Sequence, residues 1–201
     1  KGEYVDPENS SYVVHCYNGE VHGKVDLESA IADSCNSAFA KLGTEIDPTR
    51  LKALAESFYY NQKIDIGLSA NAGQFTLAEN ADVWDKMQTA IGQGATLCTP
   101  LQNLCMVSAI ANGGNLVYPS LLASVQNANG TTVKEFPYGE SYSLLSQGES
   151  DALKQFMRKV VTEGTASVLN TDAYKVCGKT GSAQVKVGSE LKTNAWFVGF
   201  A

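Results

Sequence analysis

Lys179, Thr180 and Gly181 follow one another in a stretch whose residue types suit the binding of a small carboxylate. A lone lysine supplies a positive charge, and the hydroxyl beside it supplies a second hydrogen-bond donor. Glycine has no side chain, so a ligand can lie directly against the backbone. Together the three residues predict an anion site on one extended piece of chain.

The residues around this site predict a β-hairpin. Apolar residues recur with a period of two in the segment 176–187, which is typical of a strand rather than a helix. A second run of this kind covers residues 193–201, and Gly188 and Ser189 supply the turn between the two runs. We therefore expect the Lys-Thr-Gly residues to lie on the first strand of the hairpin.

Gly178, Lys179 and Thr180 also match the end of a nucleotide phosphate-binding loop. That loop needs another glycine five residues before Gly178, where this chain has Ala173, and it needs a helix directly afterwards. The strand pattern argues against that helix, so no nucleotide site is expected. A lysine on an ordinary exposed strand remains the alternative for so short a match.

Composition narrows the class of protein. The chain has 201 residues, of which 44% are hydrophobic, enough for a core in one large domain or two small ones. Its net charge of -6 gives no electrostatic footprint for nucleic acid. No apolar run approaches the roughly 20 residues of a membrane-spanning helix. The chain begins without Met and stops within a predicted strand, so we expect that it is cut at both ends.

Cysteine and histidine spacing predicts neither a disulfide scaffold nor a metal centre. The 5 cysteines are irregularly spaced and include no Cys-x-x-Cys pair, and their odd number leaves at least one thiol unpaired within the chain. His15, Cys16 and His22 come nearest to a ligand set, but adjacent residues on an extended segment point to opposite sides. We expect no metal and no cofactor, and cysteine usage leaves the redox compartment open.

Local signals predict an α+β fold with most helices in the first half. Helix-start signals stand at Asp47-Pro48, at Thr99-Pro100 and at a capping box of Ser146 and Glu149. Predicted helices cover residues 48–59, with Leu51, Leu54, Ala55 and Phe58 buried, 81–91, 100–112, apolar nearly all round and so buried, and 148–163. Predicted strands cover residues 116–125 and 131–136 about an Asn129-Gly130 turn, while residues 1–24 form a loop with at most one short strand.

Residues 27–42 carry a helical spacing that Ser34 and Asn36 interrupt. In a straight helix these two side chains project roughly 200° apart and cannot serve one site. They can do so if one helix ends near Asp33 and Asn36 caps the next. Local sequence alone favours the continuous amphipathic helix, with both polar residues on its wet side.

Short motifs in a fixed order resemble the transpeptidase domain of penicillin-binding proteins over residues 21–201. They are Ser34-Cys35-Asn36, Ile91-Gly92-Gln93-Gly94, Thr99-Pro100-Leu101-Gln102, Ile110-Ala111-Asn112-Gly113-Gly114, Val160-Val161-Thr162-Glu163-Gly164-Thr165-Ala166 and Gly178 to Gln184. The resemblance implies the α+β fold that penicillin-binding proteins share with serine β-lactamases. It implies a mostly helical subdomain at 26–115, and a hairpin, a helix and the Lys-Thr-Gly strand pair at 116–201.

What the resemblance implies for function is acyl transfer through a serine ester. In this family the serine attacks the carbonyl between the two D-alanines of a peptidoglycan stem peptide and releases the last D-alanine. The acyl group then passes to a neighbouring amine and crosslinks the wall. β-Lactam antibiotics mimic the dipeptide and stay attached, so stem peptide and β-lactams are the expected partners, with no nucleic acid.

The resemblance also implies roles for residues of the Lys-Thr-Gly strand. Lys179 and the Thr180 hydroxyl hold the terminal carboxylate of the substrate. Gly181 lets the substrate lie against the strand. The backbone N–H of Ser182 is one of two donors to the oxyanion of the tetrahedral intermediate.

The Ser-x-Asn motif has implied roles of its own. Ser34 relays the proton toward the leaving amine. Asn36 donates to the substrate amide and helps to position the catalytic lysine of the family.

The family's nucleophile stands in a Ser-x-x-Lys motif at a helix start, well before the Ser-x-Asn motif. The literal match in this chain, Ser189 to Lys192, falls after Lys-Thr-Gly in the predicted hairpin turn, where the lysine cannot serve as the base. We therefore expect these residues to be a fragment of such an enzyme that is inactive alone, because losing a nucleophile and its base removes nearly all acyl transfer.

Several expectations follow if these residues are a fragment without the Ser-x-x-Lys helix. The predicted strands that begin at Val176 and Thr193 would then have open edges, and we expect them to pair with another chain or to be poorly ordered. The parent protein works outside the cytoplasmic membrane, tethered by a segment that these residues lack. A β-lactam sensor or a serine β-lactamase of the same superfamily remains an alternative, as does a non-catalytic module that binds peptide through Lys179 and Thr180.

Overall fold

The computed structural model describes residues 2–136 and 139–201 and has the predicted α+β class. Its helices are α1 (Leu27–Ala32), α2 (Asn36–Glu45), α3 (Pro48–Ser57), α4 (Val83–Ala90), α5 (Pro100–Ala111) and α6 (Gln147–Thr162), with short 3₁₀ turns at Tyr17–Gly19 and Ser167–Leu169. Its strands are β1 (Glu3–Val5), β2 (Val13–His15), β3 (Asn115–Val117), β4 (Ser124–Gln126), β5 (Thr132–Glu135), β6 (Ser141–Ser143), β7 (Cys177–Val187) and β8 (Glu190–Phe200).

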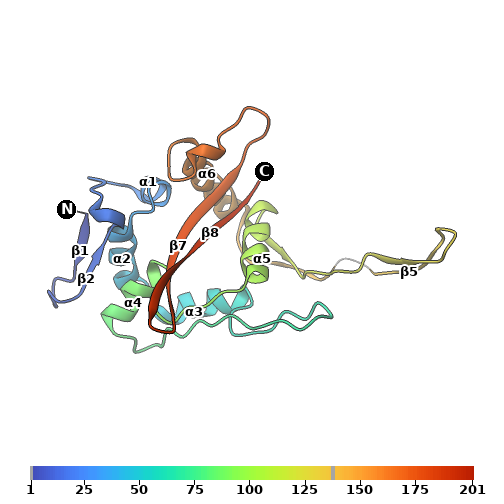
Figure 1. Ribbon diagram of the computed structural model, residues 1–201, viewed down its shortest axis with the longest axis horizontal. Coiled ribbons are helices and arrows are strands. Elements are labelled where there is room, and N and C mark those ends of the chain that lie inside the picture. Colours follow the sequence, from blue (N-terminus) through green and yellow to red (C-terminus); the bar gives the residue numbers. More distant parts are fainter. Residues whose placement is uncertain (1, 137–138) are drawn as a thin grey trace.

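The β7–β8 hairpin crosses the middle of the molecule (Figure 1). The strands pair antiparallel from Cys177 opposite Phe200 to Val187 opposite Glu190, which confirms the predicted hairpin, although β8 begins three residues earlier than expected. Helix α6 packs against β7, and α5 packs against β8. The strand that carries Lys179 is therefore supported by a helix and by its partner strand.

Close packing of Phe197 explains the glycine that precedes Lys179. A Cβ atom on Gly178 would lie 2.3 Å from the Phe197 ring and 2.9 Å from the Val198 carbonyl oxygen. Gly178 faces Gly199 in the strand register, and a Cβ there would also meet the ring. The aromatic side chain thus covers the paired glycines and fixes the first residues of β7.

The chain turns sharply between α1 and α2, so the continuous helix favoured by local sequence is wrong. The Cys35 N–H donates to the Ala30 carbonyl, and the Ser34 N–H donates to the Ile31 carbonyl. Ser34 has a φ of 52°, so it takes the left-handed position that glycine or asparagine usually fills in this helix-ending motif. The alternative of a break near Asp33 is correct, except that Cys35 is the N-cap of α2 and Asn36 its first residue.

Helix α6 docks on the end of α1 through a glycine contact. A Cβ atom on Gly164, just after α6, would lie 2.2 Å from the Ala32 carbonyl oxygen. The same carbonyl accepts a hydrogen bond of 3.2 Å from the Thr165 N–H, and Lys159 pairs with Glu28 at 3.6 Å. This contact places the residues after α6 beside the α1–α2 turn.

The helix-start signals are confirmed. Asp47 accepts hydrogen bonds from backbone N–H groups at the start of α3, and capping boxes open α5 at Thr99 and α6 at Ser146. Helix α5 is not buried all round, because Leu104 is 58% exposed. Leu54 on α3 is also exposed, against expectation.

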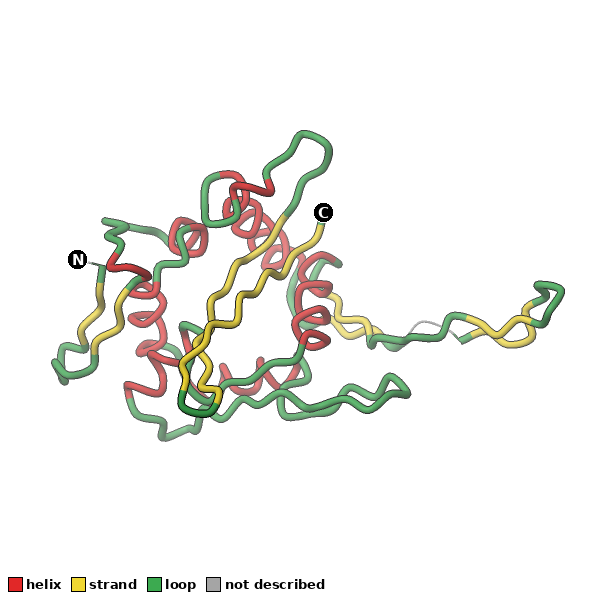
Figure 2. The backbone as a smooth tube through the Cα atoms, in the orientation of Figure 1, coloured by secondary structure: helices red, strands yellow, loops and turns green. Residues whose placement is uncertain are grey.

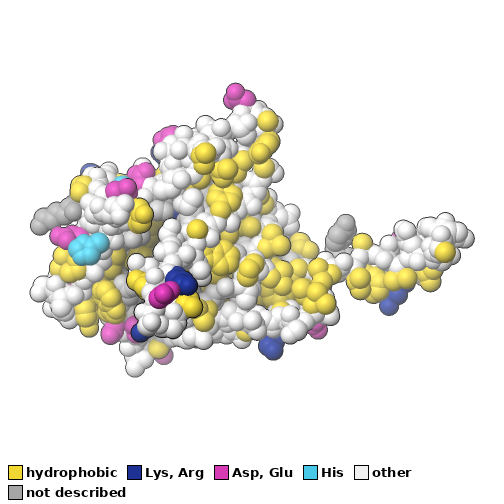
Figure 3. Space-filling view, viewed as in Figure 1, with side chains coloured by type: hydrophobic (Ala, Val, Ile, Leu, Met, Phe, Trp, Pro, Cys, Tyr) yellow, Lys and Arg dark blue, Asp and Glu magenta, His cyan; other side chains and the backbone are white. Residues whose placement is uncertain are grey.

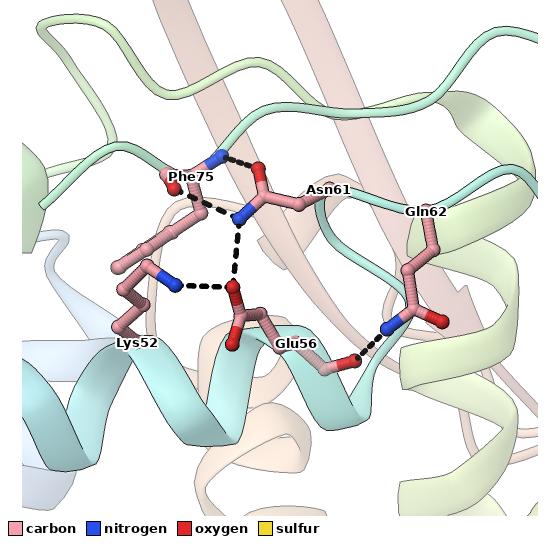
Figure 4. Close-up of polar contacts among 5 residues, drawn as sticks. All are labelled: Lys52, Glu56, Asn61, Gln62 and Phe75. Atoms are coloured by element: carbon pink, nitrogen blue, oxygen red, sulfur yellow. Dashed lines mark hydrogen bonds and ion pairs between the residues drawn. The ribbon is translucent and has the colours of Figure 1, made fainter.

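Polar contacts tie the end of α3 to the loop that follows it (Figure 4). Glu56 pairs with Lys52 one turn earlier and accepts a hydrogen bond of 3.1 Å from the Asn61 amide, and its backbone carbonyl accepts one of 3.2 Å from Gln62. Asn61 also bonds both backbone groups of Phe75, at 2.9 and 3.0 Å. A φ of 61° at Asn61 makes this arrangement possible, so the loop is held without secondary structure.

Two expectations about strands are corrected. Residues 1–24, of which Lys1 lies outside the described part, contain two paired strands, β1 and β2. The pair is held against the helices because Val14 of β2 packs against Ala40 of α2 and Met87 of α4. The predicted strand 116–125 is split into β3, which pairs with β6, and β4, which pairs with β5. Pro119 lies at the break and has no N–H for a strand ladder.

The β4–β5 hairpin extends away from the rest of the molecule as an arm whose strand residues are all exposed (Figure 2). Buried apolar side chains form separate small clusters elsewhere, the largest around Phe58, Cys105 and Leu116. Within the described residues, no helix combines the length and apolar character needed to cross a membrane.

Replacing Gly164 with alanine should lower the free energy of unfolding by about 1–3 kcal/mol, because the new Cβ would overlap the Ala32 carbonyl. Chemical denaturation measures the change. Gly148→Ala is the matched control, since a Cβ at Gly148 in α6 meets nothing within 4 Å. Equal stability of the Gly164→Ala and Gly148→Ala variants would contradict the described docking of α6 on α1.

Candidate active site

The Lys179 ammonium donates a hydrogen bond to the Ser34 hydroxyl, although 145 residues separate the two in the sequence. The ammonium also donates to the Thr180 carbonyl at 2.9 Å. Ser34 reaches the strand because the left-handed turn between α1 and α2 carries it out of both helices. The structure therefore brings the Ser-x-Asn turn and the Lys-Thr-Gly strand together at Ser34 and Lys179.

Lys179 is a partly buried cation without a carboxylate partner among the residues that the structure describes. Burial lowers the pKa of Lys179 below its ordinary value, because the charged form loses water contacts. A hydroxyl and a carbonyl accept hydrogen bonds from the ammonium but leave its charge uncompensated among the described residues. Such a charge favours an anionic ligand that can replace these weaker partners.

Thr165 belongs to this site and was not among the predicted residues. Its hydroxyl lies 2.6 Å from the Thr180 hydroxyl, and the docking of Gly164 on α1 holds it there. The run from Val160 to Ala166 was recognised as a motif, but nothing in its spacing shows that Thr165 faces Thr180. The contact depends on the packing of α6, which only the structure reveals.

Gly181 and Ser182 continue β7 beyond Thr180 and are exposed. A Cβ atom on Gly181 would meet only the Trp196 Cβ, at 3.5 Å, so no other described side chain fills the space over its backbone. In the described structure β7 and β8 form a two-stranded sheet. One edge of β7 pairs with β8, and its other edge pairs with no described strand. Backbone groups on that edge can therefore bind an extended ligand.

Asn36 lies beside the site but its amide is used elsewhere. Its Nδ2 donates to the His15 carbonyl at 3.0 Å, which joins the start of α2 to the end of β2. No hydrogen bond links Asn36 to Lys179 among the described contacts. The structure thus brings Ser34, Lys179 and Thr180 together and directs Asn36 toward the N-terminal hairpin.

Few charged side chains compete with Lys179 on the face that carries the hairpin. Figure 3 shows hydrophobic and uncharged atoms over the middle of this face, with charged groups near its margins and near the lower end of the hairpin. The literal Ser-x-x-Lys match begins at Ser189 in the turn, where Gly188 has a φ of 63°, and continues into the first residues of β8, where Lys192 pairs with Glu190 at 3.3 Å. Its expected position outside any helix is confirmed.

Fold and site define the class of protein. The family model described as the penicillin binding protein transpeptidase domain matches residues 3–201. The chain therefore belongs to the penicillin-binding protein transpeptidase family.

Two similar proteins have curated names. Stage V sporulation protein D of Bacillus subtilis is 31% identical over an alignment of 193 residues that covers 94% of this chain and 30% of that protein. The peptidoglycan D,D-transpeptidase MrdA of Acinetobacter baumannii is 31% identical over an alignment of 175 residues that covers 82% of this chain and 26% of that protein. The chain thus spans less than a third of either relative.

Solved structures share the fold. The D,D-transpeptidase domain of a peptidoglycan glycosyltransferase from Eggerthella lenta has a TM-score of 0.82 at 28% identity, with 93% of this chain and 48% of that one covered. Penicillin binding protein 3 of Mycobacterium tuberculosis in complex with ampicillin has a TM-score of 0.81 at 25% identity, with 94% and 44% covered. These matches confirm the fold expected from the sequence.

Replacing Lys179 with methionine should flatten the pH dependence of stability at alkaline pH. The unfolded chain keeps a lysine pKa near 10.5, and burial lowers the pKa in the folded protein. Between these two values the unfolded chain binds more protons, so the free energy of unfolding rises with pH. The Lys179→Met variant loses that part of the rise, which urea unfolding at a series of alkaline pH values measures.

Lys186→Met is the control, because Lys186 is exposed on the same strand. It should keep the alkaline rise of the unmodified protein. A Lys179→Met variant with the same pH dependence as the Lys186→Met variant would show that Lys179 is not desolvated in the folded protein.

Proposed function

We propose that these residues form the substrate-carboxylate side of a peptidoglycan D,D-transpeptidase that crosslinks stem peptides and is acylated by β-lactams. The observation that carries the proposal is the Lys179 ammonium on β7, which has no carboxylate partner among the described residues and donates hydrogen bonds to the Ser34 hydroxyl and the Thr180 carbonyl. Family membership and the D,D-transpeptidase name of a relative support it.

In the proposed complex, the terminal carboxylate of a stem peptide ending in D-Ala-D-Ala takes up the Lys179 charge and the Thr180 hydroxyl. A charge-assisted hydrogen bond of this kind contributes about 1.5–3 kcal/mol. Thr165 orients the Thr180 hydroxyl through their short contact. The peptide lies along the bare backbone at Gly181, and the Ser182 N–H donates to the developing oxyanion.

The nucleophile is proposed to lie outside these 201 residues. Its hydroxyl oxygen forms an ester with the penultimate D-alanine, the peptide bond to the last D-alanine breaks, and an amine of a second stem peptide then displaces the serine. Ser34 passes a proton to the leaving amine, a role supported by its hydrogen bond from Lys179. Asn36 would reach the substrate amide after giving up the His15 carbonyl.

The 201 residues alone are proposed to be inactive, since their Ser-x-x-Lys match lies in the β7–β8 turn and the first residues of β8 and not at the start of a helix. The complete protein is proposed to work outside the cytoplasmic membrane, where peptidoglycan is crosslinked, and to be tethered to that membrane. The open edge of β7 in the 201 residues alone is proposed to pair with another chain.

Replacing Thr180 with valine should slow acylation of the complete protein by a fluorescent penicillin roughly 10- to 150-fold, which corresponds to one charge-assisted hydrogen bond. The rate of labelling, followed on gels, measures the effect. Thr193→Val, an exposed position on β8, is the matched control and should leave the rate unchanged.

Two results would contradict the proposal. One is an acylation rate of the Thr180→Val variant equal to that of the Thr193→Val variant. The other is labelling of the 201 residues alone at the rate of the complete protein. Rapid release of the penicillin from the complete protein would instead identify a β-lactamase.

A further inference from the structure

One arginine joins helix α6 to both ends of the segment that leads into β7. The Arg158 guanidinium donates through Nη1 to the Val176 carbonyl at 2.9 Å and through Nη2 to the Asn170 side-chain oxygen at 2.8 Å. Arg158 lies within α6, Asn170 caps the 3₁₀ turn after that helix, and Val176 directly precedes the first residue of β7. The arginine therefore ties the connection between helix and strand at its two ends.

The connecting segment 170–176 has few other contacts with the helix. It contains no helix or strand, its residues 170–175 are exposed, and it forms the loop that projects beside α6 before β7 begins (Figure 1). Val176 packs against Val160 and Val161 of α6. The other described hydrogen bonds of the segment do not reach beyond residues 167–177, so only those of Arg158 join it to α6 within the described structure.

The geometry of arginine suits this position. A planar guanidinium carries five N–H donors and can hold two acceptors at once, whereas a lysine ammonium is a single donor centre. Arg158 is half-buried and forms no ion pair with a carboxylate among the described residues. Its charge therefore strengthens two hydrogen bonds to neutral acceptors.

The start of β7 sets the position of the residues that bind the proposed substrate. Lys179 follows Val176 by three residues, roughly 10 Å along an extended strand. Among the described strands only β8 pairs with β7, so the other edge gives it no support. Helix α6 also leads into Thr165, whose hydroxyl lies 2.6 Å from that of Thr180. Arg158 thus fixes β7 relative to the same helix that places Thr165.

We propose that Arg158 is a positioning residue of the carboxylate site. By holding the Val176 carbonyl and the Asn170 side chain against α6, it keeps the Lys179 ammonium where a terminal carboxylate can bind it together with the Thr180 hydroxyl. Arg158 does not touch the substrate and acts through the position of Lys179. The inference rests on the proposed function, in which Lys179 and Thr180 bind the carboxylate of the stem peptide.

Nothing in the local sequence indicates this role. Arg158 stands just before the recognised run from Val160 to Ala166, inside a predicted helix. Its two acceptors follow 12 and 18 residues later, beyond the end of that helix. Such spacings match no helix or strand period, so the contacts depend on how the chain folds back onto α6.

Selectivity for a free carboxylate separates positioning from stability. The complete protein is acylated with benzylpenicillin and with its methyl ester, which keeps the β-lactam ring but has no negative charge, and the ratio of the two second-order rate constants is measured. In the unmodified protein this ratio should be roughly 10 to 150. A loss of folded protein lowers both rate constants equally and leaves the ratio unchanged. A displaced Lys179 lowers only the rate constant for the free acid.

Variants at Arg158 should change this ratio. Arg158→Met should lower it about 3- to 30-fold, because the donors to the carboxylate lose their alignment. Arg158→Lys keeps the charge and should retain a larger ratio than Arg158→Met. Arg50→Met, at an exposed position on α3, is the matched control and should leave the ratio unchanged.

A second background tests whether Arg158 acts through Lys179. In a protein that already carries Lys179→Met, the further change Arg158→Met should alter the ratio by less than about twofold, because the ammonium through which Arg158 acts is already gone. An equal fall of the ratio in the two backgrounds would overturn the inference.

The inference is also overturned if the ratio of the Arg158→Met variant equals that of the Arg50→Met variant, whatever the absolute rates, since Arg158 would then only stabilise the fold. Asn170→Ala, which removes one acceptor at an exposed position, decides the question if Arg158→Met does not fold. A lowered ratio in Asn170→Ala supports the inference, and an unchanged ratio overturns it. A ratio near one in the unmodified protein would instead contradict the proposed function.

Discussion

The hydrogen bond from the Lys179 ammonium to the Ser34 hydroxyl is the interaction on which the site depends. It joins the hairpin to the turn between α1 and α2 and helps to satisfy a cation that burial has removed from water. No carboxylate neutralises that cation among the described residues. The protein therefore keeps a partly buried positive charge to which an anionic ligand can bind. This charge is the physical basis of the proposed preference for a substrate with a terminal carboxylate.

Three backbone features make this contact possible. Ser34 accepts a left-handed conformation at the end of α1, Gly164 lets α6 approach Ala32, and Gly178 makes room for the Phe197 ring. Each is a point of close approach where an ordinary side chain or helix would move one part of the site away. The polar residues can act together because small residues elsewhere allow the elements to pack.

Sequence reasoning was most successful where the signal was local. The β7–β8 hairpin followed from its period of two, and α3, α5 and α6 followed from capping residues at Asp47, Thr99 and Ser146. Ser34 could not be placed by local sequence, because the turn uses serine where glycine is usual, and only the family resemblance paired it with the strand. Thr165 acquires its neighbour Thr180 through tertiary packing, so this contact was not predictable.

A double-mutant cycle on the unfolding free energy tests the Lys179–Ser34 contact most directly. The variants are Ser34→Ala, Lys179→Met and the two combined, each measured by chemical denaturation at neutral pH. A hydrogen bond to a charged group predicts a coupling energy of about 1–3 kcal/mol between the two positions. Additive effects, with coupling below about 0.3 kcal/mol, would mean that the two side chains do not interact and would contradict the account given for this site.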